Sequence, residues 1–143
     1  MSLQTEHFER CVATLRASLE RLTTAEPGGI DREVFRNAAV KGFELALETA
    51  GKLLRKALKE FAGDPGQVDS LGYKDVFRHA VRHGLVDADL AERWFAYRDA
   101  RNATAHDCGE ALAQETVAML AGFVDDATAL HRILREKLAR GDA

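Results

Sequence analysis

The sequence predicts an all-α protein, an antiparallel up-down bundle of about five helices. Apolar residues recur at spacings of three and four along most of the 143 residues, which is the period of an amphipathic helix. Only two prolines and 11 glycines interrupt this pattern, and no stretch alternates as a strand would. Because 46% of the residues are hydrophobic, a chain of this length can bury one core, and we expect a single domain over residues 1–143.

The first two predicted helices form a hairpin around a Pro27-Gly28-Gly29 turn. The first helix has one apolar stripe made of Phe8, Cys11, Val12, Leu15, Leu19 and Leu22. Asp31 is the expected N-cap of the second helix, which continues to about Ala62. Its predicted buried face consists of Phe35, Ala38, Ala39, Gly42, Phe43, Ala46, Leu47, Ala50, Leu54, Ala57, Leu58 and Phe61.

A loop and three further helices complete the bundle. Residues 63–72 contain Gly-Asp-Pro-Gly and read as a loop. A short helix then buries Val76, Ala80 and Val81, and Gly84 ends it. Asp87 or Asp89 caps a fourth helix that presents Leu90, Trp94 and Tyr97 on one side, and Asp107-Cys108-Gly109 ends that helix. The last helix buries Val117, Leu120, Phe123, Val124, Ala127, Leu130, Leu134 and Leu138.

Composition narrows the class of protein. Twenty basic and 23 acidic residues give a net charge of -3, which argues against a uniformly cationic nucleic-acid binder but allows a local basic stripe. Cys11 and Cys108 form no spaced framework, which is typical of a reducing compartment. No apolar run approaches the ~20 residues that cross a bilayer, and the N-terminus lacks a signal-peptide pattern. We therefore expect a soluble, cytoplasmic protein without membrane contact.

The residues with the most chemical potential lie at the end of the fourth predicted helix. Arg98, Asn102 and His106 follow each other at four-residue spacing, and Arg101 is one position round. Arginine binds phosphate oxygens, and histidine exchanges a proton near neutral pH. Together they would suit metal-independent RNA cleavage, with histidine moving the proton and arginine stabilising the phosphorane. On spacing alone, however, a structural role in capping the last helix carbonyls is favoured.

Several sequence blocks favour a functional role for these residues instead, because together and in this order they resemble a known family. Residues 43–48 read Phe-Glu-Leu-Ala-Leu-Glu and are followed by Lys52. Residues 75–80, Gly84-Leu85-Val86, Trp94 and the segment 101–107, Arg-Asn-Ala-Thr-Ala-His-Asp, follow in order. This set resembles the small bacterial nucleotidyltransferase substrate-binding proteins of the HEPN fold (higher eukaryotes and prokaryotes nucleotide-binding), with their Arg-Asn-x-x-x-His signature. The resemblance covers residues from about 35 to 134.

The resemblance implies a homodimer in which two such motifs meet at one cleft. It also implies a minimal-type nucleotidyltransferase, encoded nearby, as the partner in a toxin–antitoxin module. In active members the motif is a ribonuclease site, which would make Arg101, Asn102 and His106 catalytic here, with no cofactor or metal. Around them we expect substrate contacts from Arg98, Lys52, Thr104, Asp107 and Cys108. Two alternatives remain open: a non-catalytic subunit that binds substrate or nucleotide for the nucleotidyltransferase, and a purely structural helical interaction module.

The sequence departs from the family pattern at two positions. Many members have a tyrosine two residues after the histidine, which in some modules the partner adenylylates; here that residue is Cys108. If this chain is still adenylylated, Thr104 or Tyr97 would have to accept the group. The family's tryptophan in the long helix is replaced by Gly51, which predicts altered packing beside Lys52.

Other polar groups have simpler explanations. Lys52, Arg55, Lys56 and Lys59 form a basic stripe that would follow an RNA backbone or bind an acidic partner, although a solvated helix face is favoured. His79 and His83 have the spacing of two metal ligands but no third ligand in the sequence, so we expect no metal site. Glu44 and Glu48 are expected to pair with Lys41 or Lys52. Trp94 and Tyr97 would stack on a base, but a position in the core or at a dimer interface is favoured.

Overall fold

The computed structural model describes residues 5–61, 65–106 and 110–141, and the side chains of residues 5–60, 66–103 and 114–136. Six helices and no strands lie in these ranges, which confirms the predicted all-α class. Their bounds are α1 Glu6–Thr24, α2 Ile30–Phe61, α3 Pro65–Asp69, α4 Tyr73–Arg82, α5 Ala88–His106 and α6 Glu110–Gly141. In this described part of the chain, none of the helices has the apolar length that crossing a bilayer requires.

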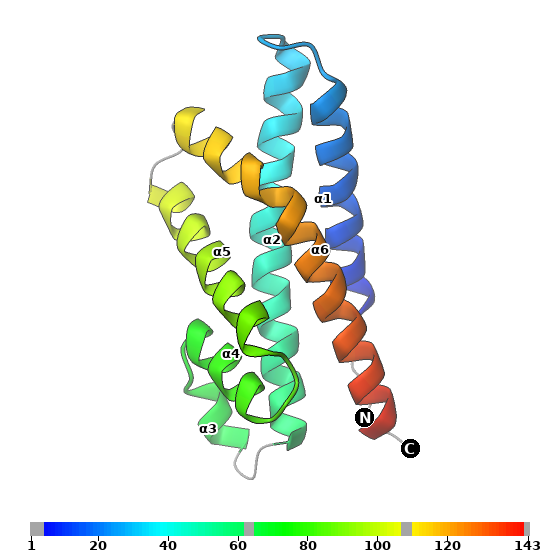
Figure 1. Cartoon of the computed structure of the whole chain (residues 1–143), viewed down its shortest axis with the longest axis vertical. Helices are drawn as coiled ribbons and strands as arrows, with labels where there is room; N and C mark the ends of the chain where they lie inside the picture. Colours follow the sequence, from blue (N-terminus) through cyan, green and yellow to red (C-terminus); the bar gives the residue numbers. More distant parts are fainter. Residues whose placement is uncertain (1–4, 62–64, 107–109, 142–143) are drawn as a thin grey trace.

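The long helix α2 organises the bundle (Figure 1). It forms an antiparallel hairpin with α1, and α6 packs against both helices of that hairpin. The short α3 and α4 and the longer α5 pack along the C-terminal half of α2. The two halves of α2 therefore have different neighbours, and its C-terminal half lies beside the helix that carries the polar motif.

The centre of the core is a group of aromatic side chains from four helices. Trp94 is fully buried and stacks on Phe77 with ring centroids 5.2 Å apart. Phe123 packs against Trp94 at 5.3 Å, against Tyr97 at 5.0 Å and against Phe43 at 4.9 Å. Such pairs each contribute about 0.5–1.5 kcal/mol beyond burial. The favoured interpretation of Trp94 and Tyr97 as core residues is thus confirmed.

The buried face of α2 differs from the predicted one. Ala38 is exposed and Phe35 only half-buried, whereas Leu53 is buried although the periodicity did not select it. The reason is that α1 and α6 cover the N-terminal half of α2, while α3, α4 and α5 cover a further side of its C-terminal half. The predicted N-cap is also wrong, because α2 already begins at Ile30 and Asp31 lies inside its first turn.

The segment after α2 is more ordered than predicted, since it contains the short helix α3. Arg55 donates a hydrogen bond to the carbonyl oxygen of Val68 at 2.7 Å, and Lys59 pairs with Asp69 at 2.5 Å. Val68 is itself buried. Two cations of the predicted basic stripe therefore hold α3 against α2.

The ends of the short helices follow the sequence signals. Gly84 has a positive φ of 73°, the left-handed conformation that ends α4 at little steric cost for glycine. Of the two candidate caps for α5, Asp87 is the one used, because its carboxylate accepts a hydrogen bond from the backbone N–H of Leu90 at 2.7 Å. These two signals fix where α5, and with it the polar motif, begins.

Candidate functional site

A basic pocket of about 250 Å³ lies where α2, α4 and α5 meet. Its lining contains four cationic side chains and one carboxylate, and consists of Glu48, Gly51, Lys52, Arg55, Tyr73, Arg98 and Arg101. Residues 48–55 come from α2, Tyr73 begins α4, and the last two arginines lie one turn apart on α5. The pocket therefore concentrates positive charge in a protein whose net charge is -3, and it is suited to an anion.

Tyr73 is held in one position by hydrogen bonds at its hydroxyl group. The hydroxyl donates to the carbonyl oxygen of Leu47 at 2.6 Å and accepts from the indole Nε1 of Trp94 at 2.9 Å. Burial raises the pKa of Tyr73 well above its ordinary value, so the phenol stays neutral. The ring of Tyr73 is thus a fixed, uncharged wall of the pocket.

Gly51 is the reason that the Tyr73 ring can lie so close to α2. A Cβ atom at position 51 would be 3.0 Å from Cδ2 of Tyr73 and closer still to its Cε2. No larger residue fits unless the ring moves. The altered packing expected beside Lys52 therefore has a specific form, in which an aromatic residue of α4 occupies space next to α2.

The cations of the pocket differ in how firmly they are held. The guanidinium of Arg98 lies 4.6 Å from the centroid of the Tyr73 ring, within range of a cation–π interaction. Lys52 is exposed and pairs with Glu48 at 3.4 Å, one turn away on α2. Arg55 is committed to the backbone of α3, through the carbonyl oxygens of Val68 and Asp69. Arg98 and Lys52 are therefore the cations best able to meet a ligand.

The structure brings some of the predicted site residues together and not others. Arg98, Arg101 and Lys52 share the pocket. Asn102 is exposed and does not line it. His106 is the last residue of α5 and Thr104 lies in the same helix, but their side chains lie outside the described ones, and Asp107 and Cys108 lie outside the described residues altogether.

Sequence reasoning did not select Tyr73 or Glu48 for this site, and it treated Arg55 only as part of a stripe. Gly51 was the one signal available, because a glycine inside a long helix often marks a place that another group approaches closely. That signal marks the position but does not identify the approaching residue. Tyr73 is 22 positions further along the chain, and only the tertiary fold places it there.

The prediction that Tyr97 could accept an adenylyl group is wrong. Tyr97 is only 7% exposed, and its hydroxyl group donates to the carboxylate of Asp126. Burial, and then the hydrogen bond to Asp126, raise the pKa of Tyr97 above its ordinary value. Arg93 holds the same carboxylate through two hydrogen bonds of 2.9 and 3.1 Å. A hydroxyl that is buried and already bonded in this way is unavailable to an external enzyme.

The remaining polar candidates have structural roles. Lys41 lies 4.0 Å from Glu44, and Lys52 pairs with Glu48, which confirms the predicted pairing of these glutamates. His79, on α4, is half-buried, and His83, which follows the end of α4, is exposed. Among the described side chains, no group of three metal-ligating residues occurs.

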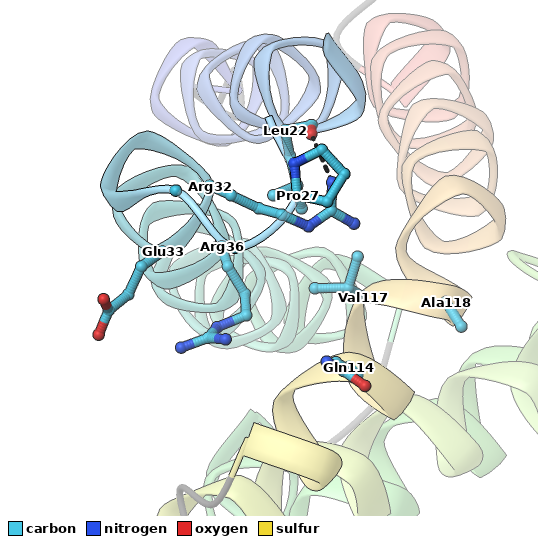
Figure 2. Close-up of a pocket in the computed structure, with 10 residues that line it drawn as sticks. Leu22, Pro27, Arg32, Glu33, Arg36, Gln114, Val117 and Ala118 are labelled. Atoms are coloured by element: carbon cyan, nitrogen blue, oxygen red, sulfur yellow. Dashed lines mark hydrogen bonds between the residues drawn. The ribbon is translucent and has the colours of Figure 1, made fainter. Parts of the chain in front are cut away.

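A larger cavity, of about 690 Å³, lies between the α1–α2 turn and the beginning of α6 (Figure 2). Arg32 reaches across it towards the carbonyl oxygen of Leu22, at 3.4 Å. The other lining residues include Pro27, Arg36 and Val117. None of the predicted site residues lines this cavity. Although this cavity is the larger of the two, the basic pocket has the charged side chains of the predicted site and is therefore the candidate site.

Comparison with known proteins agrees with this architecture. The family model of nucleotidyltransferase substrate binding protein like chains matches residues 3–136. A probable ribonuclease HepT from Haemophilus influenzae is 31% identical over 99 residues, which span 69% of this chain and 66% of that relative. The solved structure of HI0074, also from Haemophilus influenzae and described as the fold of a substrate binding domain of a nucleotidyltransferase, superposes with a TM-score of 0.82 at 24% identity. It covers 92% of this chain and 99% of that one. The chain therefore belongs to the nucleotidyltransferase substrate binding protein like family.

Proposed function

We propose that the protein is a ribonuclease toxin and the partner of a minimal nucleotidyltransferase in a toxin–antitoxin module. The observation that carries the proposal is that Arg101, from the Arg-Asn-x-x-x-His motif, lines a basic pocket together with Arg98 and Lys52. The 31% identity to a probable ribonuclease supports it. Arg101, Asn102 and His106 are the proposed catalytic residues, and Thr104, Asp107 and Cys108 would flank the substrate.

The proposed reaction uses RNA's own 2′-hydroxyl as nucleophile and needs no cofactor. The 2′-oxygen forms a bond to the adjacent phosphorus and gives its proton to one His106 imidazole as general base. The bond from phosphorus to the 5′-oxygen breaks, and that oxygen takes a proton from a second, protonated imidazole. Arg101 stabilises the extra negative charge of the phosphorane between these steps. The products are a 2′,3′-cyclic phosphate and a 5′-hydroxyl end.

The helical register favours a site composed from two chains. Residues 101 and 106 are five positions apart on α5, which separates them by about 140° around the helix axis. Two helix positions so far apart around the axis do not converge easily on one phosphate within a single chain. A twofold axis would bring Arg101 of one protomer near His106 of its partner and would supply the second imidazole that the reaction needs.

An exposed apolar face on α2 supports a second copy of this chain as the neighbour. Ile30, Val34 and Leu45 are 73%, 54% and 44% exposed, and helical geometry puts them within an arc of about 60°. Glu48 and Lys52 continue the same face to the basic pocket. A self-complementary contact along this face would bury the apolar side chains and bring two pockets together.

Cleavage is the direct test of the proposal. The purified protein, freed from any nucleotidyltransferase, should cut RNA in the presence of a metal chelator. His106→Ala should abolish the cut, whereas His83→Ala, which changes an exposed histidine just after α4, should retain it. Circular dichroism checks that both variants are folded. Undiminished cutting by the His106→Ala protein would refute the catalytic assignment.

The dimer is tested separately, by light scattering coupled to gel filtration. We expect the wild-type protein to have the mass of a dimer. Val34→Glu should give a monomer and lose cleavage together with dimerisation, because a charge would be buried in the apolar contact. Ala13→Glu, at an exposed position of α1, is the matched control. A Val34→Glu protein that remains dimeric would exclude this face as the interface.

A second candidate function is a non-catalytic subunit that binds substrate or nucleotide for a nucleotidyltransferase. The description of the family and the anion-binding chemistry of the pocket favour it. It predicts tight nucleotide binding without RNA cleavage, and capture of a nucleotidyltransferase encoded beside it at micromolar concentration. If the protein neither cleaves RNA nor binds a nucleotide or a nucleotidyltransferase, the structural interaction module is the function that remains.

A further inference from the structure

We infer that the pocket between α2 and α5 binds a terminal phosphate, the phosphomonoester at an RNA end or on a free nucleotide. The inference deepens the proposed function and rests on it, because Arg101 lines the same pocket. Arg98 and Lys52 would hold the terminal phosphate, while Arg101 would meet the adjacent phosphodiester that is cleaved. Three properties of the pocket lead to this inference: its charge, its size and the fixed position of Arg98.

The charge of the pocket exceeds what an internal phosphodiester needs. Even without Arg101, the cationic side chains of Lys52, Arg55 and Arg98 outnumber the one carboxylate of the lining, that of Glu48, by two. A phosphodiester within a chain has one negative charge. A phosphomonoester carries about -1.5 to -2 at neutral pH and has three terminal oxygens that accept strong hydrogen bonds. An excess of positive charge at one small site therefore matches a terminal phosphate better.

The size of the pocket limits what enters it. At about 250 Å³, it is smaller than the roughly 300–1,000 Å³ that is usual for sites enclosing a drug-sized ligand. The pocket has room for a phosphate group but is small for a complete nucleotide with its base. The base would remain outside, so the pocket would recognise an end of the chain irrespective of its sequence.

The position of Arg98 suits it to fix this phosphate. Its guanidinium lies over the Tyr73 ring at 4.6 Å, and the hydroxyl group of that ring is held by two hydrogen bonds, to Leu47 and Trp94. A cation positioned by a fixed ring loses little conformational freedom when it binds an anion. Lys52, on an exposed and flexible stem, would close over the phosphate as a second cation.

The test compares two RNA 10-mers of the same sequence, one with a 5′-phosphate and one with a 5′-hydroxyl. Binding is measured by fluorescence anisotropy on the His106→Ala protein, so that cleavage does not interfere. We expect the phosphorylated RNA to bind about 10–100-fold more tightly, as one or two charge-assisted hydrogen bonds would provide. An RNA pair that differs in its 3′-phosphate gives the same measurement at the other end.

Two variants and one control test whether the preference for a phosphorylated RNA end arises in the pocket. Arg98→Gln and Lys52→Gln should each reduce it by about tenfold or more. Lys56→Gln changes an exposed lysine one turn from Lys52 that does not line the pocket, and should leave the preference intact. Thermal unfolding shows whether Arg98→Gln is still folded, and Lys52→Gln, at an exposed position, tests the inference independently of folding.

Competition distinguishes the two sources of the phosphate. If AMP displaces the phosphorylated RNA and adenosine does not, the pocket accepts free nucleotides as well as RNA ends. If AMP fails to compete while the 5′- or 3′-phosphate still improves binding, the pocket is specific for RNA ends. Equal affinity of the paired RNAs at both ends, or a preference that survives both Arg98→Gln and Lys52→Gln, overturns the inference. Absence of RNA cleavage by the wild-type protein would refute the ribonuclease proposal and leave these binding results interpretable.

Discussion

Gly51→Ala should destabilise this protein, although alanine is the better helix former. A Cβ atom at position 51 would overlap the ring of Tyr73, with Cδ2 at 3.0 Å and Cε2 closer. The ring cannot turn aside freely, because its hydroxyl is bonded to Leu47 and Trp94. It must therefore move away from α2 and strain or lose those hydrogen bonds.

The expected change in the free energy of unfolding is the sum of two destabilising contributions and one stabilising contribution. Overpacking of a filled site costs about 1–3 kcal/mol. Weakening the two hydrogen bonds of Tyr73 costs roughly a further 1 kcal/mol. Replacing glycine by alanine inside a helix returns about 1 kcal/mol. The net loss is about 1–3 kcal/mol, which for a chain of this size lowers Tm by roughly 3–10 °C.

Calorimetry or thermal circular dichroism measures this change, and α2 supplies its own control. At Gly42 the added Cβ would lie 3.5 Å from Leu15, an ordinary contact, so Gly42→Ala should leave Tm unchanged or raise it. In the Tyr73→Ala background the penalty of Gly51→Ala should disappear, as a double-mutant cycle would show. If Gly51→Ala is as stable as Gly42→Ala, the packing argument is wrong.

Three further predictions follow from the described contacts. Tyr73 and Tyr97, the two tyrosines of the chain, have raised pKa values when folded, so native protein should show no phenolate absorbance at pH 10. The tyrosines of the unfolded chain ionise at about pH 10, so their contribution to the free energy of unfolding should be fully present below that pH and should fall as the pH rises above it. A native tyrosine that titrates at about pH 10 would contradict this. Trp94 is the one tryptophan and is fully buried, so its fluorescence should resist acrylamide quenching, and Trp94→Ala should cost about 3–5 kcal/mol in urea unfolding. Arg55→Ala should release α3 from α2, because its guanidinium bonds the carbonyl of Val68; we expect faster amide exchange at residues 66–71, and unchanged exchange there would show that the bond is dispensable.

Much of the fold could be predicted, because the spacing of apolar residues along a helix depends only on residues that are close in sequence. The stripe from Phe8 to Leu22 and the run from Leu120 to Leu134 define α1 and α6 correctly. Gly84 and Asp87 mark helix ends through local signals, a positive φ at Gly84 and a side-chain cap at Asp87. The prediction was wrong where a neighbour decides burial. Ala38 has the right spacing but no helix over it, and residues 65–69 form a helix because α2 supplies their partners.

The candidate site could be predicted only in part for the same reason. Arg98 and Arg101 belong to a local pattern that the sequence displays. Whether they share a pocket with Lys52 depends on the packing of α5 against α2, which no spacing within either helix encodes. The adenylylation hypothesis for Tyr97 was wrong because its partner, Asp126, lies 29 residues away on α6.

By itself, the sequence determined that this is a helical bundle and which short segment carries the Arg-Asn-x-x-x-His motif. These properties depend on residues within a few turns of one another. Only the tertiary structure decided that Tyr73 fills the space left by Gly51, that Arg98 lies on that ring, and that Arg55 and Lys59 hold α3. Each of these contacts joins different helices, and its free energy depends on the distance and burial that chain folding creates between them.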